Sequence, residues 1–338
     1  MNIDSRIIFK DCEKISFRLS SIENLKDVSL FLTGGTGFFG KWILQTICIL
    51  NDQFKRNIQV TCLTRDSSRF LKKYPFFDRL NINFIEGDVR KFTIPNKHFD
   101  LVIHAATETS TRTSNNQDIQ SVILDGMDHM LDFVKQCGVS RFLFTSSGGV
   151  YGEMPQGQKS FSETMLPHPS SLYGKAKLEA ECNCLLRSQQ EGWIGTIARC
   201  FSFVGPYLPL DANFAIGDFV QDVLMNSSII IQGDGTAIRS YMYASDLVEW
   251  LFVLLLCNNK STIYNVGSPY PISILNLAHH ISEASLIPIT MCNQIKNKGI
   301  KSIYVPDTTR IQEKFKLELT IPLSLGIKQT IEFYKNNY

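Results

Sequence analysis

The stretch Val28-Ser-Leu-Phe-Leu-Thr33, followed by Gly34-Gly-Thr-Gly-Phe-Phe-Gly40, decides the fold. Its first six residues are a short, mostly apolar run that ends at a glycine, as expected of a buried parallel strand. Apolar residues at helical spacing then run from Phe38 to Leu50. The glycines therefore join a strand to a helix, which is the start of a parallel α/β sheet.

The same alternation of strand and helix continues through the first 200 residues of the chain. Further strands are expected at residues 58–63, 82–85, 101–104, 142–145 and 194–198, and long helices at 119–137 and 171–190. Gly138 and Gly192 follow these helices, where glycine commonly caps a C-terminus. The alternation predicts a Rossmann-type, doubly wound parallel sheet covered by helices on both faces.

The composition is that of a globular protein. Apolar residues make up 44% of the 338 residues and charged residues 20%, which is enough for a sizeable core. The net charge of +2 comes without a basic run, so nucleic acid is not expected as a partner. Nine cysteines at irregular spacing favour reduced thiols in a cytoplasmic protein over a disulfide framework, and no metal site is predicted.

No part of the sequence predicts a membrane segment. The N-terminus carries no apolar signal core. The most apolar stretch, residues 250–257, is too short to span a bilayer and is expected to be a buried helix.

The glycine-rich turn has the spacing of a dinucleotide-binding loop. Gly34 permits the tight turn, Gly37 lets the backbone approach a pyrophosphate, and Gly40 lets helix and strand pack closely. Free N–H groups at the start of the helix would face the phosphates. The residues predicted to bind the dinucleotide here are Gly34, Thr36, Gly37, Phe38, Phe39 and Gly40.

The end of the second strand bears on the choice between NAD and NADP. An acidic residue there would accept the ribose hydroxyls of NAD, but Thr64 takes that place and Arg65 follows it. An arginine can stack on adenine and pair with a 2′-phosphate, so NADP is preferred over NAD. The alternative is that Arg65 and Arg69 are solvated and Asp66 serves the ribose.

The third and fourth strands end in further candidate cofactor contacts. Asp88 is placed to touch the adenine edge, with an ordinary helix cap as its alternative role. Val89, Ala105 and Ala106 belong to the predicted cofactor-binding set, and the small alanines leave room for the dinucleotide. Tyr173 and Lys177, on a later helix, complete this set, with Lys177 placed to hold the nicotinamide ribose. His104, at the end of its strand, is expected to be a packed, hydrogen-bonded side chain rather than a catalyst.

Tyr173 and Lys177 are the candidate catalytic pair. Residues four apart lie on one face of a helix, and Ser147 ends the fifth strand upstream of them. A free tyrosine has a pKa of about 10, but an ammonium and a positively charged nicotinamide nearby would lower that pKa. Tyr173 would then take a proton from a sugar hydroxyl while hydride leaves its carbon, with Ser147 bonding the same oxygen. The alternative is a Tyr–Lys pair on a surface helix.

These motifs make the chain resemble the extended short-chain dehydrogenase/reductase superfamily, in its nucleotide-sugar epimerase/dehydratase branch. The resemblance covers about residues 28–335 and continues into the C-terminal part through Gly233-Asp-Gly235, Arg239 to Asp246, and Tyr264-Asn-Val-Gly267. It implies a Rossmann domain with bound NAD(P), and a nucleoside-diphosphate sugar as substrate. It also implies a catalytic trio, substrate contacts and a dimer interface. The trio is Ser147, Tyr173 and Lys177; the substrate contacts are Ser147, Asn213 and Arg239, with Arg239 on the diphosphate; the homodimer forms through helices 119–137 and 171–190.

Three parts of the chain follow from the motifs and the resemblance. Residues 1–27 lack clear periodicity and are expected to be an N-terminal extension. Residues 28–199 would form the NAD(P)-binding domain that carries the Ser/Tyr/Lys set. Residues 200–338, where glycine, proline and aromatic residues cluster, would be mainly a smaller substrate-binding lobe, with interleaved boundaries.

The residues that depart from the family pattern limit which reaction type the chain is expected to catalyse. Relatives that are 4,6-dehydratases carry Asp-Glu directly after the residue matching Ser147, and decarboxylating relatives carry a glutamate at the position of Gly149. This chain has Gly148 and Gly149, which supply no acid or base; Glu108 is the candidate substitute. An epimerase is therefore expected first, and an NADPH-dependent keto-deoxy-sugar reductase second. A non-catalytic dinucleotide sensor is the alternative from another class.

Overall fold

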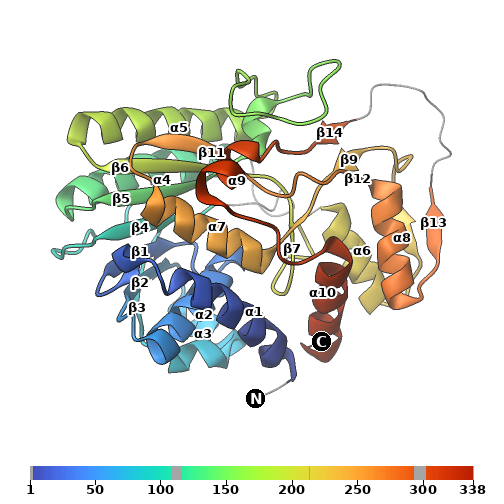
Figure 1. Ribbon diagram of the computed structural model, residues 1–338, viewed down its shortest axis with the longest axis horizontal. Coiled ribbons are helices and arrows are strands. Elements are labelled where there is room, and N and C mark those ends of the chain that lie inside the picture. Colours follow the sequence, from blue (N-terminus) through green and yellow to red (C-terminus); the bar gives the residue numbers. More distant parts are fainter. Residues whose placement is uncertain (1–2, 108–115, 213, 293–301, 338) are drawn as a thin grey trace.

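The computed structural model describes residues 3–107, 116–212, 214–292 and 302–337, so Asn213 and Glu108 lie outside the described residues. A seven-stranded parallel sheet, in the order β11-β6-β5-β4-β1-β2-β3, forms its centre (Figure 1). The strands are β1 (Ser29–Thr33), β2 (Gln59–Thr64), β3 (Ile82–Glu86), β4 (Leu101–His104), β5 (Arg141–Ser147), β6 (Ile194–Cys200) and β11 (Thr262–Val266). The predicted Rossmann-type fold is confirmed, with every predicted strand present.

Alternate residues of each central strand pack into two hydrophobic cores, one on each face of the sheet. Leu30 and Leu32 of β1 pack into one core, while Phe31 between them packs into the other. The first core lies under α2 (Phe38–Phe54) and α7 (Ala244–Cys257), and the second under α4 (Asn116–Gln136) and α5 (Leu172–Glu191). Burial on both faces explains why these strands are continuous apolar runs in the sequence.

The helices end where the glycines indicate. Gly138, just after α4, has φ +65°, and Gly192 caps α5 in the left-handed region. The apolar stretch 250–257 lies within α7, as a buried helix. Short helices complete this half of the molecule: η1 (Glu23–Leu25), α3 (Ser67–Lys73), η2 (Pro75–Arg79) and η3 (Gly148–Tyr151).

The C-terminal part of the chain builds three small sheets beside the main one (Figure 1). They pair β7 (Phe203–Val204) with β10 (Met242–Tyr243), β8 (Ile229–Ile231) with β13 (Ile289–Met291), and β9 (Ile238–Arg239) with both β12 (Ile272–Ser273) and β14 (Ile303–Tyr304). The helices here are α6 (Ala215–Leu224), α8 (Ile274–Ser285), α9 (Thr309–Phe315) and α10 (Leu323–Asn337). Because β11 nevertheless pairs with β6, both 28–199 and 200–338 supply strands to the main sheet, and their division into domains stays a prediction.

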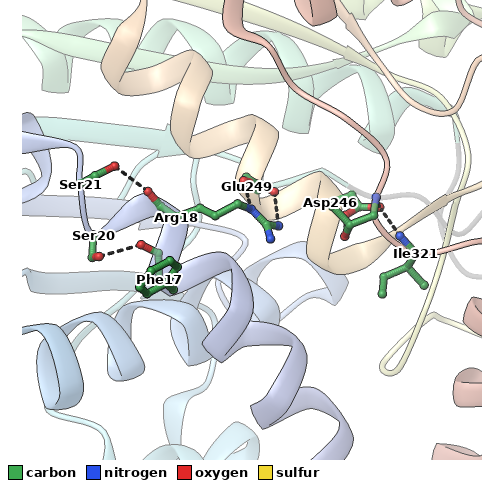
Figure 2. A network of polar contacts seen from close by, with 8 residues as sticks. Phe17, Arg18, Ser20, Ser21, Asp246, Glu249 and Ile321 are labelled. Atoms are coloured by element: carbon green, nitrogen blue, oxygen red, sulfur yellow. Dashed lines mark hydrogen bonds and ion pairs between the residues drawn. The ribbon is translucent and has the colours of Figure 1, made fainter.

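The N-terminal extension is an ordered helix, α1 (Ile3–Leu19), packed against α2 and α7. Arg18 forms a bidentate pair with Glu249 of α7, at 2.5 Å for both nitrogen–oxygen distances (Figure 2). One helical turn earlier in α7, Asp246 accepts hydrogen bonds from the backbone N–H groups of Thr320 and Ile321, just before α10. The two carboxylates of α7 thus fasten both α1 and the segment that leads into α10.

Within the described ranges, no helix combines the length and the apolar character needed to cross a bilayer. All nine cysteines are free thiols, and no disulfide joins them.

Candidate active site

The glycine loop lies at the carboxyl edge of the sheet, tightly packed against its neighbours. Gly34 has φ +73°, and a Cβ there would lie 2.5 Å from the carbonyl oxygen of Ala105. A Cβ on Gly40 would lie 2.3 Å from the Gly34 carbonyl oxygen. Side chains are therefore excluded at both positions. Gly37 is the N-cap residue of α2, and Gly37, Phe38 and Phe39 at the start of this helix line the cavity described below.

This geometry fits the pyrophosphate of a dinucleotide. The loop presents backbone rather than side chains, and it leads into a 17-residue helix whose N-terminus favours an anion. Phe38 and Phe39 border the cavity at the same place, and Ala105, directly after β4, also lines it. NAD(P) would be held here by Gly34, Gly37, Phe38 and Phe39, and their contact with the cofactor stays a prediction.

The acidic groups at the ends of β2 and β3 are engaged by neighbouring groups of the protein. Asp88 pairs with the Arg90 guanidinium at 2.6 Å, and this hydrogen bond lowers the pKa of the carboxyl to about 2. Asp66 caps α3 by accepting the Arg69 N–H at 2.7 Å. Arg65 is exposed. Adenine contact by Asp88 stays a prediction.

His104 is a packed structural histidine. It is buried, its Nδ1 lies 2.7 Å from Thr33 Oγ1, and its ring stacks on Phe144. Burial, with the nearby Lys177 ammonium, lowers its pKa to about 3, so the imidazole is neutral at physiological pH. Thr33 Oγ1 also accepts the Ala106 N–H, which ties the ends of β1 and β4 together.

Tyr173, Lys177 and Ser147 lie together at the carboxyl edge of β5. Lys177 is fully buried, its ammonium donates to the Thr145 carbonyl at 3.0 Å, and it stands 5.8 Å from the centre of the Tyr173 ring. The Ser147 hydroxyl is close enough to favour ionisation of the Tyr173 phenol by hydrogen bonding. Ser171 caps α5 through the Gly174 N–H at 3.0 Å, which fixes the helical turn carrying Tyr173.

Without a cofactor, the pKa of Tyr173 is set by its burial. Burial raises it to about 12, because desolvation of the phenolate outweighs the opposing effect of the nearby Ser147 and Thr107 hydroxyls. The same burial lowers the pKa of Lys177 to about 8. The expected lowering of this pKa depends on the ammonium and a positively charged nicotinamide together, and it stays a prediction for the enzyme with its cofactor. The sequence does not reveal how deeply both side chains are buried.

A buried ion pair supports the floor of this site. Arg199 of β6 and Glu181 of α5 form a bidentate pair, with 2.6 Å between Nη2 and Oε2. Ser146 donates to the same carboxylate at 2.5 Å, which orients the strand residue next to Ser147. The guanidinium of Arg199 also lies 4.7 Å from the centre of the Tyr151 ring. These contacts fix β5, β6 and α5 relative to one another.

Gly148 and Gly149 face different surroundings. A Cβ on Gly148 would lie 2.7 Å from the ring of Phe201 and 2.8 Å from the hydroxyl of Tyr304. At Gly149 the nearest atom would be Ser147 Oγ at 3.3 Å. Phe201 and Tyr304 thus fill the space that a side chain at position 148 would need. The Tyr304 hydroxyl itself lies 3.5 Å from Ser147 Oγ.

One large cavity, of about 2700 Å³, connects these features. Its lining comes from both the N-terminal and the C-terminal range of the chain. The predicted residues that line it are Gly34, Gly37, Phe38, Phe39, Ala105, Ser147, Tyr173 and Arg239. The other predicted residues that the structure describes are not part of this lining: Thr36, Gly40, Arg65, Asp88, Val89, Ala106 and Lys177. Arg239 Nη1 donates to the carbonyls of Ile238 and Ser302, at 2.8 and 3.1 Å.

Comparison with known proteins shows which family this chain belongs to. The model of the NAD dependent epimerase/dehydratase family matches residues 30–267. The dTDP-glucose 4,6-dehydratase of Streptomyces niveus is 23% identical over 316 residues, which are 91% of this chain and 93% of that protein. UDP-glucuronic acid decarboxylase 1 of Arabidopsis thaliana is 25% identical over 323 residues, 92% of this chain and 71% of that protein.

A solved structure shows the same fold. It is a mutant of UDP-glucuronic acid 4-epimerase from Bacillus cereus, in complex with UDP-4-deoxy-4-fluoro-glucuronic acid and NAD. The TM-score is 0.78 at 20% identity, over 92% of this chain and 100% of that one. The chain belongs to the NAD dependent epimerase/dehydratase family and is an enzyme of this kind, which confirms the resemblance seen in its motifs.

Three residues of the site were not predicted from the sequence. Tyr304 reaches Ser147 from β14, far away in the chain. Thr107, directly after the two alanines that follow β4, has a buried hydroxyl close to the Tyr173 phenol. Lys41 directly follows Gly40 and lines the cavity. A polar residue next to a recognised motif was a usable signal for Thr107 and Lys41, whereas nothing local indicated Tyr304.

Proposed function

We propose that this enzyme is an epimerase of a nucleoside-diphosphate sugar that acts through a transient keto sugar. The observation that carries the proposal is the pairing of Ser147 and Tyr173 at the cavity beside Gly148 and Gly149. The site has hydroxyl groups for moving a proton to and from a sugar oxygen. At positions 148 and 149 it lacks the side chains that would eliminate water.

Bound NAD(P) supplies the acceptor and donor of hydride in this scheme. Tyr173 takes the proton of the sugar hydroxyl and later returns it to the keto oxygen. Ser147 bonds that same oxygen and holds it in line with the phenol. Lys177 keeps a positive charge behind the Tyr173 ring, and a positively charged nicotinamide adds the charge that the protein by itself does not supply.

The substrate class rests on the relatives and on Arg239. The relatives named above act on nucleotide sugars according to their names. Arg239 lines the cavity on β9, where a guanidinium suits a diphosphate. Asn213 remains a proposed substrate contact by position alone. The cavity also has the volume for both a dinucleotide and a nucleotide sugar.

We propose NADP as the preferred form of the cofactor. Thr64 stands where an NAD-preferring site has its acid, and the Asp66 carboxylate, the alternative ribose ligand, is already engaged in capping α3. Arg65 is exposed beside them and can reach a 2′-phosphate. The same feature favours the second candidate function, reduction of a keto-deoxy sugar with NADPH.

The proposed assembly is a homodimer through α4 and α5, and the proposed location is the cytoplasm. These two helices pack side by side and are linked at the surface by Arg187 and Asp132, 3.4 Å apart. Leu172 and Leu186 of α5 are exposed large apolar residues, as an interface would require.

Analysis of the reaction products distinguishes an epimerase from an NADPH-dependent reductase. Nucleoside-diphosphate sugars and keto-deoxy sugars are incubated with limiting NADP⁺ or with NADPH, and the products are identified by NMR. We expect interconversion of two epimers without net consumption of NADPH. Stoichiometric oxidation of NADPH by a keto sugar would instead establish the reductase.

The Tyr173→Phe variant tests the mechanism in the same assay. We expect turnover to fall by at least about a hundredfold, the usual scale of acid–base catalysis, while the dissociation constant for the cofactor stays the same. Tyr270→Phe, at an exposed position, is the matched control. Near-normal turnover of Tyr173→Phe would remove this residue from the reaction.

A further inference from the structure

Lys41 is a buried cation at the edge of the glycine loop. Its side chain is only 6% exposed, although it lies in the first turn of α2, directly after Gly40. The ammonium donates to the Thr36 carbonyl at 3.1 Å. It also lies 4.7 Å from the ring centre of Tyr74 and 5.1 Å from that of Tyr207. The charge is therefore held in one place by a carbonyl and two aromatic faces.

No carboxylate of the described residues forms an ion pair with Lys41. Burial, together with the nearby charge of Lys73, lowers the pKa of Lys41 to about 8. An ammonium removed from water without an anion is unfavourable, and such groups are usually paired or functional. Lys41, Lys73 and Arg79 all line the cavity. An anionic ligand bound in the cavity would therefore lie near these three positive charges.

The Lys41 ammonium is attached to the part of the glycine loop that lies over β2. A Cβ on Gly35 would lie 2.3 Å from Cys62 Sγ, so the loop containing Gly35 and Thr36 lies over that strand. The residues that end β2 and follow it are Thr64 and Arg65. In a dinucleotide-binding fold the adenosine ribose lies at the end of this second strand. The ammonium anchored to the Thr36 carbonyl thus lies on the loop over β2, and Arg65 follows the end of that strand.

We propose that Lys41 binds the 2′-phosphate of NADP together with Arg65, with Tyr74 and Tyr207 as the aromatic walls of this subsite. The Gln45 amide donates to the Tyr207 hydroxyl at 2.9 Å, and Tyr207 has φ +70°, so its ring is held against Lys41 rather than placed by chance. The inference rests on the proposed preference for NADP. It goes further by assigning that preference to a buried lysine outside the β2 end.

Binding of two cofactor fragments tests the subsite without turnover. Adenosine 2′,5′-bisphosphate carries the 2′-phosphate and 5′-AMP lacks it, and both are titrated calorimetrically into the full-length protein. We expect the wild type to bind the bisphosphate at least about tenfold more tightly, as one charge-assisted phosphate contact provides. Lys41→Met should abolish most of that ratio while the affinity for 5′-AMP changes less than about twofold.

Two further variants test whether the effect depends on the positive charge at position 41. Lys41→Gln keeps a donor for the Thr36 carbonyl but no charge, and it should lose the ratio as Lys41→Met does. Lys72→Met removes an exposed charge from the nearby helix α3 and should leave the ratio unchanged. Thermal melting of each variant checks that it is folded.

The possible outcomes distinguish a failure of the role assigned to Lys41 from a failure of the proposed preference for NADP. A wild type that binds both fragments equally would overturn the preference for NADP itself. A ratio that is lost in Arg65→Ala but kept in Lys41→Gln would overturn only the role of Lys41. Equal loss of both fragments in the folded Lys41 variants would show that the residue shapes the glycine loop instead, and would also overturn the inference.

Discussion

Gly148 shows how a single missing side chain can be part of the site's architecture. The space beside it is filled by Phe201 and Tyr304, so the absence of an acid there is matched by packing from another part of the chain. Restoring an acid at this position would require both aromatic side chains to move. At position 148, therefore, the absence of a side chain is matched by the surrounding packing, whereas Gly149 has no such neighbours.

The two glycines should respond differently to alanine. In Gly148→Ala the new methyl group would overlap Phe201 and Tyr304, and we expect a loss of about 1–3 kcal/mol in the free energy of unfolding, as is usual for overpacking. In Gly149→Ala the nearest atom is the movable Ser147 hydroxyl, so the loss should be below about 1 kcal/mol. Urea denaturation of both variants measures this difference. Equal losses would mean that the aromatic packing at position 148 is not restrictive.

At the same scale, the sequence predicts which residues meet but not their electrostatic state. The i, i+4 spacing of Tyr173 and Lys177 places both on one face of α5, and the structure brings Ser147 to them. Their burial depends on how distant elements pack around them, so the raised pKa of Tyr173 could not be predicted from local spacing.

The elements of the main sheet were predictable because each one carries its own signal. A strand buried on both faces is a continuous apolar run, and the helices between the strands are bounded by glycine caps. The short strands of the C-terminal part carry no such signal. β9 and β14 have two residues each, and they exist only because distant segments pair. α1 was likewise uncertain, because its stability comes from docking on α2 and α7.

The docking of α1 can be tested through Arg18. In Arg18→Met the Glu249 carboxylate stays buried without its partner, and we expect the free energy of unfolding to fall by about 1–3 kcal/mol, since the arginine is itself 40% exposed. The double variant Arg18→Met/Glu249→Met should recover much of that loss, because no unpaired charge remains. The exposed Arg6→Met is the control. A double variant as unstable as the single one would mean that Glu249 does not depend on this pairing.

At the scale of the whole molecule, the site exists only where the two ranges of the chain meet. The Rossmann half contributes the glycine loop, Ser147 and Tyr173, while the C-terminal part contributes Arg239 and Tyr304. The motifs of each half are visible in the sequence, but the contact between Ser147 and Tyr304 depends on how β14 is placed against β5. Which sugar the cavity accepts depends on the same placement, and for that reason it does not follow from the motifs.

The most direct test of the account is a crystal structure of the enzyme with NADP and a nucleoside-diphosphate sugar bound. The account predicts that the phenolic oxygen of Tyr173 lies about 2.6–3.2 Å from the hydroxyl of the sugar carbon that faces the nicotinamide. Ser147 should contact the same sugar oxygen. A Tyr173 side chain turned away from the nicotinamide, with no room for a pyranose beside it, would contradict the account.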